Sequence, residues 1–259
     1  MTALSINLNK IALLRNSRDT QYPDPLYFGE RCIELGAQGL TVHPRPDQRH
    51  IRPEDVQRLA LLTQSHAAIE YNIEGNPFAT ANDTGYPGFL ELVMAARPDQ
   101  VTLVPDSDNQ LTSDHGFDLK QSGDQLQRIT EQFQAEGIRV SLFMDPDSEQ
   151  IQLAAELGVE RIELYTGPYS LAFGKTEQPT HTDTFDSVHG RYSVAAKTAQ
   201  QQGLGVNAGH DLNLYNLASF CEIPDILEVS IGHAFTVDAL LMGIEAATRA
   251  YLDILAPPR

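Results

Sequence analysis

The stretch VSLFMDPDSEQIQLAAELGVERIELY, residues 140–165, contains a complete strand–helix–strand unit. Residues 140–144 and 162–165 are short, mostly apolar runs, which is typical of buried strands. Between them, residues 148–157 place apolar side chains three and four positions apart, which is typical of an amphipathic helix. Gly158 follows, and glycine at this place commonly ends a helix. The unit therefore predicts two parallel strands joined by a helical crossover.

The same alternation repeats along the chain, and we count eight units. The predicted strands are residues 4–8, 40–43, 69–74, 101–104, 140–144, 162–165, 206–208 and 228–231. The predicted helices are residues 25–35, 53–64, 88–96, 121–135, 148–157, 188–202, 213–220 and 237–254. Eight such units predict an α/β fold, a (β/α)₈ TIM barrel in a single domain over residues 1–259, because closing a parallel sheet leaves no unpaired edge. An open, doubly wound parallel sheet is the alternative.

The composition restricts the partners. The 259 residues include 18 Lys and Arg against 35 Asp and Glu, a formal net charge of −17. This charge repels nucleic acid backbones and anionic lipid, and no apolar run reaches the roughly 18 residues of a membrane span. Residues 1–8 resemble a strand rather than an export signal, and Cys32 and Cys221 are the only cysteines. We therefore expect a soluble cytoplasmic protein with free thiols that binds neither nucleic acid nor membrane.

Polar and apolar residues alternate along most of the predicted strands. Ser5 and Asn7, for example, share one face of the first strand, while Ile6 and Leu8 share the other. The apolar face is expected to pack on the helices, which places the polar face inside the barrel, where its groups must bond one another, water or a ligand. A polar ligand at one end of the barrel is the simplest explanation. The long irregular segment 168–186 predicts a lid over that end.

Reactive groups in this fold lie where strands end, and most of the predicted strands here end in polar residues. His43 and His210 follow the second and seventh strands, and an imidazole can give or take a proton near neutral pH. Glu74 ends the third strand, where burial without a cation would raise its pKa and suit it to proton transfer. A structural pairing of Glu74 with Arg45 or His43 is the alternative. Glu163 on the sixth strand could similarly do no more than orient a neighbour.

Two groups of residues are candidates for binding phosphate. The positively charged candidates after the first two strands are Arg15, Arg18, Arg45, Arg49 and His50. A guanidinium group suits phosphate because its planar fork can donate two parallel hydrogen bonds to two phosphate oxygens. Gly209, Gly232 and His233 follow the last two strands, where barrel enzymes often hold phosphate with backbone N–H groups. Two anion sites that flank acid–base groups predict two phosphorylated small-molecule substrates.

A metal ion and a covalent mechanism are the alternatives. Carboxylates and histidines at the strand ends could bind a divalent ion, as in a metal-dependent sugar isomerase, but the sequence has no compact ligand spacing. Lys10 is the only one of the four lysines that falls at a strand end, so a Schiff-base aldolase is the other alternative.

Several segments together resemble the pyridoxine 5′-phosphate synthase family, which closes the ring of vitamin B6. They are residues 11–18, 39–45, 49–51, 103–105, 140–143, 206–210 and 231–233, and the likeness extends over nearly the whole chain. The resemblance implies a (β/α)₈ barrel that assembles into a homo-octamer. It implies condensation of 1-deoxy-D-xylulose 5-phosphate with 3-amino-2-oxopropyl phosphate to give pyridoxine 5′-phosphate, phosphate and water, with no metal and no organic cofactor.

The resemblance also implies a role for each matching residue. His43 and Glu74 would accept protons, His210 would donate one, and Glu163 would stabilise a transition state. The residues implied for binding the two substrate phosphates are Asn7, Arg18, Gly232 and His233 for the amino ketone, and Arg45, His50 and Thr112 for the xylulose phosphate.

Two places depart from the commonest pattern of the family. Asn9 and Lys10 stand where Asp-His is usual, and Asp211 stands where a glycine usually follows the donor histidine. A backbone contact at Asp211 survives this change, whereas side-chain contacts at Asn9 and Lys10 do not simply carry over. We expect a variant branch that keeps the activity and in which these three residues contact substrate. The alternative is a barrel that binds a phosphosugar or a B6 phosphate without turnover.

Overall fold

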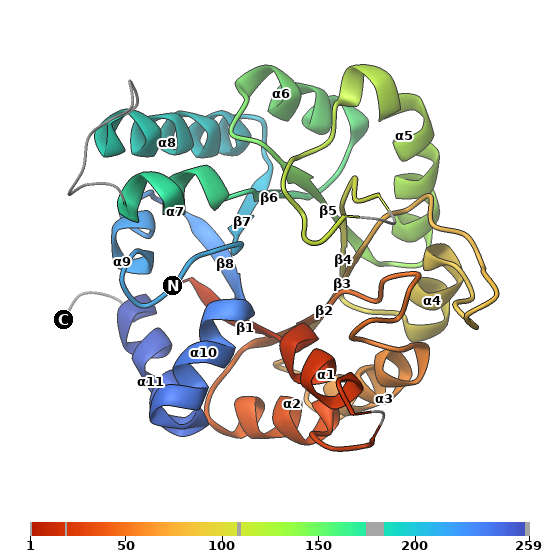
Figure 1. Cartoon of the computed structure of the whole chain (residues 1–259). Coiled ribbons are helices and arrows are strands. Elements are labelled where there is room, and N and C mark those ends of the chain that lie inside the picture. The colour runs from red at the N-terminus through yellow and green to blue at the C-terminus, as the bar shows by residue number, and fades with distance from the viewer. Residues whose placement is uncertain (1, 19, 108–109, 175–183, 257–259) are drawn as a thin grey trace.

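The structure, a computed structural model, describes residues 2–18, 20–107, 110–174 and 184–256. Its strands form a closed barrel in the order β1 to β8, and each strand pairs in parallel with the next (Figure 1). The strands are Ala3–Asn7 (β1), Gly39–Val42 (β2), Glu70–Gly75 (β3), Gln100–Leu103 (β4), Arg139–Met144 (β5), Arg161–Leu164 (β6), Gly205–Ala208 (β7) and Ile226–Ile231 (β8). The predicted TIM barrel is confirmed, and the open sheet is excluded because β1 pairs with β8.

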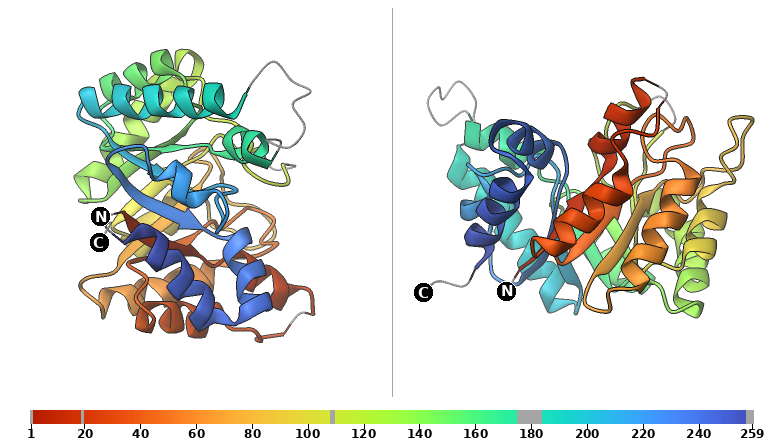
Figure 2. Two further views of the ribbon diagram at one scale, coloured as in Figure 1. Left: turned by 90° about the vertical axis from the view of Figure 1, so that its left-hand side faces the viewer. Right: turned by 90° about the horizontal axis from the view of Figure 1, so that it is seen from below.

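Helices form a layer around the barrel (Figures 1 and 2). They are Asn9–Asn16 (α1), Pro25–Glu34 (α2), Pro53–Gln64 (α3), Phe89–Ala96 (α4), Leu119–Ala135 (α5), Ser148–Leu157 (α6), Gly167–Gly174 (α7), Phe185–Gln201 (α8), Leu217–Phe220 (α9), His233–Met242 (α10) and Ile244–Leu255 (α11). The bounds of α3 and α6 are those predicted. Within the described part of the chain, no helix combines the length and the apolar character that a membrane crossing requires.

Local signals in the sequence explain the well-predicted helix α6. The Asp147 side chain accepts hydrogen bonds from the backbone N–H groups of Glu149 and Gln150, which satisfies donors that the first turn leaves free. Gly158 ends the helix with φ 88°, in the left-handed region where glycine has no steric penalty. Both ends of this crossover are therefore fixed by side-chain chemistry that the sequence displays.

Some predictions of local structure were wrong. Helix α1 was not predicted, because the segment after β1 was interpreted as a loop. Residues 237–254 form parts of two helices, since Gly243 at φ 87° separates α10 from α11. In the predicted lid 168–186, residues 168–174 belong to α7 and residues 185–186 begin α8, while 175–183 lie outside the described residues.

The predicted polar interior of the barrel is confirmed. Ser5 and Thr41 share a hydrogen bond of 2.8 Å between their hydroxyl oxygens, and the Thr102 hydroxyl donates to Asn72 Oδ1 at 3.0 Å. All four side chains are buried, so they satisfy one another without bulk water. The alternate residues, such as Ile6, pack outward in the core between sheet and helices. The polar interior continues to the carboxyl ends of the strands, where the candidate site lies.

Candidate active site

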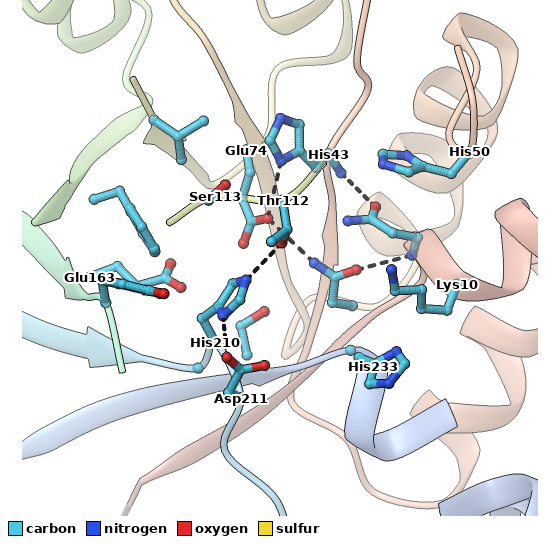
Figure 3. A pocket seen from close by; sticks show the side chains of 18 of the residues that line it. Lys10, His43, His50, Glu74, Thr112, Ser113, Glu163, His210, Asp211 and His233 are labelled. Carbon is cyan, nitrogen blue, oxygen red and sulfur yellow. Dashed lines mark hydrogen bonds and ion pairs between the residues drawn. The ribbon is translucent and has the colours of Figure 1, made fainter. Parts of the chain in front are cut away.

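A cavity of about 460 Å³ lies at the carboxyl ends of the strands. The predicted site residues that line it are Asn7, Asn9, Lys10, His43, Arg45, Arg49, His50, Glu74, Thr112, Glu163, Gly209, His210, Asp211, Gly232 and His233. Figure 3 shows Lys10, His50 and His233 on one side of the cavity and Glu163 across from them. Two predicted phosphate ligands, Arg15 and Arg18, do not line the cavity, and Arg18 lies exposed.

His43 and Glu74 face each other inside this cavity. His43 Nδ1 lies 3.9 Å from Glu74 Oε2, and both side chains are largely buried (Figure 3). Burial lowers the pKa of His43 well below its usual value, and the nearby positive charges of Arg45, His50 and Arg49 lower it further. Burial raises the pKa of Glu74 well above its usual value, and the Glu163 and Asp106 charges raise it further. Both groups are therefore held neutral, which suits them to exchange a proton.

The end of β1 positions this acid–base pair. Asn7 Nδ2 donates to Glu74 Oε2 at 3.3 Å, and Asn7 Oδ1 accepts the backbone N–H of Asn9 at 3.0 Å. The Asn9 side chain in turn accepts the backbone N–H of His43 at 2.8 Å through its Oδ1. Asn9, which stands where the family usually has Asp, therefore holds the backbone of His43 through its side-chain oxygen. Of the two alternative partners for Glu74, His43 lies 3.9 Å away, whereas Arg45 pairs with Asp106.

The segments after β1 and β2 form a cationic group, which we define as Lys10, Arg45 and Arg49, and the ring of His50 lies beside them. Both guanidinium groups donate to the backbone carbonyl of Gln110, at 3.5 Å from Arg45 and 2.6 Å from Arg49. Burial lowers the pKa of Lys10, and the charges of Arg49 and Arg45 lower it further. Burial, with the same two arginines, lowers the pKa of His50 to about 3. Positive charge is thus concentrated where a phosphate could neutralise it.

Arg15 does not belong to this cationic group, although the sequence made it a candidate phosphate ligand. Its guanidinium is 1% exposed and bonds both carboxylate oxygens of Asp55, at 2.6 and 2.8 Å. A third bond of 3.1 Å reaches the backbone carbonyl of His50. The prediction for Arg15 is wrong because its guanidinium is buried against Asp55 and does not line the cavity. The arginine instead fixes the backbone that carries His50.

His210 lies on the opposite side of the cavity from the cationic group. Its Nδ1 is 3.1 Å from Asp211 Oδ2, and its Nε2 is 2.8 Å from the Thr112 hydroxyl (Figure 3). The hydrogen bond from His210 lowers the pKa of Asp211. Asp211 has φ 66°, in the left-handed region that favours glycine and that Asp tolerates better than most residues. This explains how Asp can stand where the family usually has glycine, and it adds a carboxylate beside the predicted proton donor.

Two carboxylic acids lie deeper in the barrel on the same side. Burial, together with the Glu228 charge, raises the pKa of Glu163 to about 8. Burial likewise raises the pKa of Glu228 to about 7, although Arg161 at 3.4 Å opposes the change. Glu163 therefore carries a proton near neutral pH and can donate a hydrogen bond into the cavity.

Sequence reasoning missed some residues of the cavity. Ser113, Phe143 and Tyr165 line it, and the buried carboxylate of Asp106 lies beside it, bonded to Arg45. Asp106 is one of the strand-end carboxylates that the sequence offered only as possible ligands of a divalent ion. Its position directly after β4 was the available signal, since the carboxyl ends of neighbouring strands meet at one edge. No group of three or more His, Cys, Asp or Glu side chains suited to hold a metal ion occurs among the described residues.

Comparison with known proteins decides the family. Residues 4–257 match the family described as pyridoxal phosphate biosynthesis protein PdxJ. The chain belongs to this family. Pyridoxine 5′-phosphate synthase of Xanthomonas oryzae pv. oryzae (strain PXO99A) is 54% identical over 255 residues, which cover 98% of this chain and 96% of that protein. The synthase of Xylella fastidiosa (strain M23) is 51% identical, over 98% and 95% of the two chains. The chain is accordingly an enzyme of vitamin B6 biosynthesis, with pyridoxine 5′-phosphate synthase activity.

Two solved structures of low sequence identity have the same fold as this chain. Phosphoribosyl anthranilate isomerase from Thermococcus kodakaraensis has a TM-score of 0.58 at 13% identity, with 100% of both chains covered. A mutant tryptophan synthase α-subunit from Pyrococcus furiosus has a TM-score of 0.59 at 12% identity, with 98% of this chain and 97% of that chain covered. At such identities the likeness supports the barrel and nothing about the chemistry.

Proposed function

We propose that the barrel condenses 1-deoxy-D-xylulose 5-phosphate with 3-amino-2-oxopropyl phosphate and that the strand-end residues carry the proton transfers. The observation that carries this proposal is the neutral pair of His43 and Glu74, 3.9 Å apart and enclosed between the cationic group and His210. Imine formation, dehydration, loss of phosphate and ring closure all require protons to be moved, and none requires an electron carrier. The substrate amine supplies the ring nitrogen.

Each acid–base residue has a part in this sequence. His43 is neutral as the free base, so it accepts a proton from substrate carbon or nitrogen. Glu74 is neutral as the protonated acid, so it first gives its proton to a substrate oxygen and then, as a carboxylate, accepts the next one. His210, with Asp211 and Thr112 on its two ring nitrogens, donates a proton to a departing oxygen. The protonated Glu163 stabilises a developing negative oxygen by hydrogen bonding from inside the barrel.

The two phosphate groups bind at different parts of the rim. Arg45, His50 and Thr112 hold the xylulose phosphate, and the concentration of positive charge in the cationic group supports this assignment. Asn7, Gly232 and His233 hold the phosphate of the amino ketone, where the first turn of α10 offers backbone N–H groups. Arg18 belongs to the same set on resemblance, and its exposed position requires it to move to reach the phosphate. Lys10 contacts a substrate oxygen as a point charge.

The chain also works as a homo-octamer in the cytoplasm on this proposal. Exposed apolar side chains on α10 support contact with other copies, since Leu240 and Leu241 are 77% and 79% exposed. Sedimentation of the purified protein tests the assembly.

The deciding experiment mixes the purified enzyme with the two substrates and measures pyridoxine 5′-phosphate and released phosphate. We expect both products in equal amounts. Tight binding of either substrate without product would favour the non-catalytic barrel. Absence of both binding and product would reject the assignment of substrates. A catalytically inactive Glu74→Gln variant in the same assay shows that product formation depends on this site.

A further inference from the structure

Asp106 lies on the other side of the His43 ring from Glu74. Its Oδ2 is 4.0 Å from His43 Nε2, whereas Glu74 Oε2 is 3.9 Å from Nδ1. The two side chains are almost fully enclosed, with 2% of Asp106 and 6% of His43 exposed. The ring is therefore placed between two carboxyl groups, and each of its nitrogens faces a different one.

The protein fixes the Asp106 carboxylate in place. Oδ2 accepts a hydrogen bond from Arg45 Nη2 and another of 2.8 Å from the Ser113 hydroxyl. The backbone carbonyl of Asp106 accepts from Asn76 Nδ2 at 2.8 Å. Three groups from three segments of the chain thus hold one acidic residue that also faces the ring of the proposed base.

The second carboxylate oxygen is left without a partner. Among the described residues, nothing donates a hydrogen bond to Asp106 Oδ1, although that atom is buried. Leaving a buried carboxylate oxygen without a hydrogen bond is unfavourable, so it calls for a reason. The Nε2–H of His43 and the hydroxyl or amine groups of a substrate are the donors that this side of the cavity can offer.

We propose that Asp106 is a positioning residue for the reaction, acting through His43. In the neutral ring the proton resides on Nε2, facing the Asp106 carboxylate, and Nδ1 keeps its lone pair toward Glu74 and the substrate. A proton taken up at Nδ1 produces an imidazolium between two carboxyl groups, and the Asp106 charge stabilises it. The proposal rests on the role of His43 as base under the proposed function.

The other charges around His43 make such an anion necessary. The charged and titratable groups that face the ring are Glu74 at the end of β3, Asp106 after β4, and Arg45, Arg49 and His50 after β2. The two arginines disfavour a protonated ring, and Glu74 is neutral. Asp106, which forms an ion pair with Arg45, is the carboxylate among these groups that can offset them when His43 takes up its proton.

A simpler role for Asp106 is to hold Arg45 for phosphate binding, and kinetics separate the two. Asp106→Asn keeps the shape and removes the charge. If Asp106 acts through His43, kcat falls by on the order of tenfold or more, while KM for either substrate changes little. If it only holds Arg45, KM for one phosphorylated substrate changes and kcat does not, and that result would overturn the proposal.

Two further variants control for loosening of the segment after β4 that carries Asp106. Asp106→Glu retains the charge, and we expect it to recover part of the kcat that Asp106→Asn loses. Asn76→Ala removes the hydrogen bond to the Asp106 backbone and leaves its carboxylate intact, so kcat should stay within about threefold of wild type. Equal losses in Asp106→Asn and Asp106→Glu would point to packing and contradict the proposal.

Nitrogen NMR of the histidine rings tests the proposal without any turnover. In the wild-type enzyme without substrate, we expect the His43 signal of a neutral ring protonated on Nε2. In Asp106→Asn, the proton should redistribute toward Nδ1. A wild-type ring protonated on Nδ1 would overturn the proposal even if the Asn variant failed to fold. Absence of product from wild type would reject the proposed function alone, because the ring signal still decides the role of Asp106.

Discussion

The two histidines of the site lie in opposite environments. His43, at the end of β2, is 6% exposed, and burial, with Arg45, His50 and Arg49 nearby, lowers its pKa well below the usual value. His210, after β7, is 23% exposed and has the Asp211 carboxylate 3.1 Å away. One ring is kept neutral by burial and cations, and the other lies beside a carboxylate. The same residue type is thus equipped to accept a proton on one side and to donate one on the other.

The difference extends to the carboxyl groups beside each ring. Glu74, next to His43, has a pKa raised well above its usual value by burial and by the Glu163 and Asp106 charges. Asp211, next to His210, has a pKa lowered by its hydrogen bond to the ring. Pairs of titratable groups whose environments push their pKa values apart are how one site performs both acid and base catalysis. The division of labour between the two sides can be tested by changing one member of each.

The largest expected effect comes from Glu74→Gln. Glutamine keeps the shape and the hydrogen bond from Asn7 but cannot exchange a proton, so kcat should fall by on the order of 10² or more. Substrate affinity, measured by calorimetry, should change little because the cationic group is untouched. Turnover within a few-fold of wild type would assign the base to His43 alone and would remove Glu74 from the proton transfers.

Much of this arrangement could be predicted from the sequence. The alternation of polar and apolar residues placed Ser5, Thr41 and Asn72 inside the barrel, because strand side chains alternate between two faces. The rule that barrel strands end at the active site placed His43, Glu74 and His210 in one cavity. These predictions depend only on period and chain direction, which are local properties of the sequence.

The rest depends on contacts between segments that are distant in the sequence. Arg15 and Arg45 have equal standing as phosphate ligands in the sequence. Only the structure shows that the first is buried against Asp55 outside the cavity and that the second lines it. Asp106 has no local signal for its contact with His43, since the two residues follow different strands. The sequence shows that Asp211 stands where the family usually has glycine. It shows neither the φ of 66° at this residue nor its contact with His210.

A smaller effect is expected from Lys10→Met on the cationic side. Burial and the two arginines lower the pKa of Lys10, which would also suit a nucleophile, but the substrate already supplies the imine nitrogen. We therefore expect Lys10 to act by charge, so that its replacement weakens binding of one substrate roughly tenfold, equivalent to about 1.4 kcal/mol. Borohydride added with either substrate should leave no mass adduct on the peptide that contains Lys10. A stable reduced adduct would make this a covalent enzyme.

The smallest effect is expected from Asp211→Asn on the side of His210. Asn also tolerates the left-handed backbone at this position, so the substitution removes the charge without adding strain. The Asn oxygen can still accept from the ring, so only the charge of the contact is lost. A loss of about 0.5–1.5 kcal/mol should lower kcat roughly threefold to tenfold.

The same substitution has a predicted dependence of stability on pH. Because the folded pKa of Asp211 is lowered, the pair stabilises the fold above the ordinary Asp value of about 4, and this contribution disappears as pH falls through the folded pKa. The Asp211 side chain is 47% exposed, so the difference in the free energy of unfolding should stay below about 1 kcal/mol. Urea unfolding of both proteins at about pH 3 and about pH 6 measures it, and the difference is expected at the higher pH only. A loss of several kcal/mol at both pH values would mean that Asp211 supports the β7 loop itself, and the contrast between a buried base and an exposed, carboxylate-paired donor would then no longer describe the site.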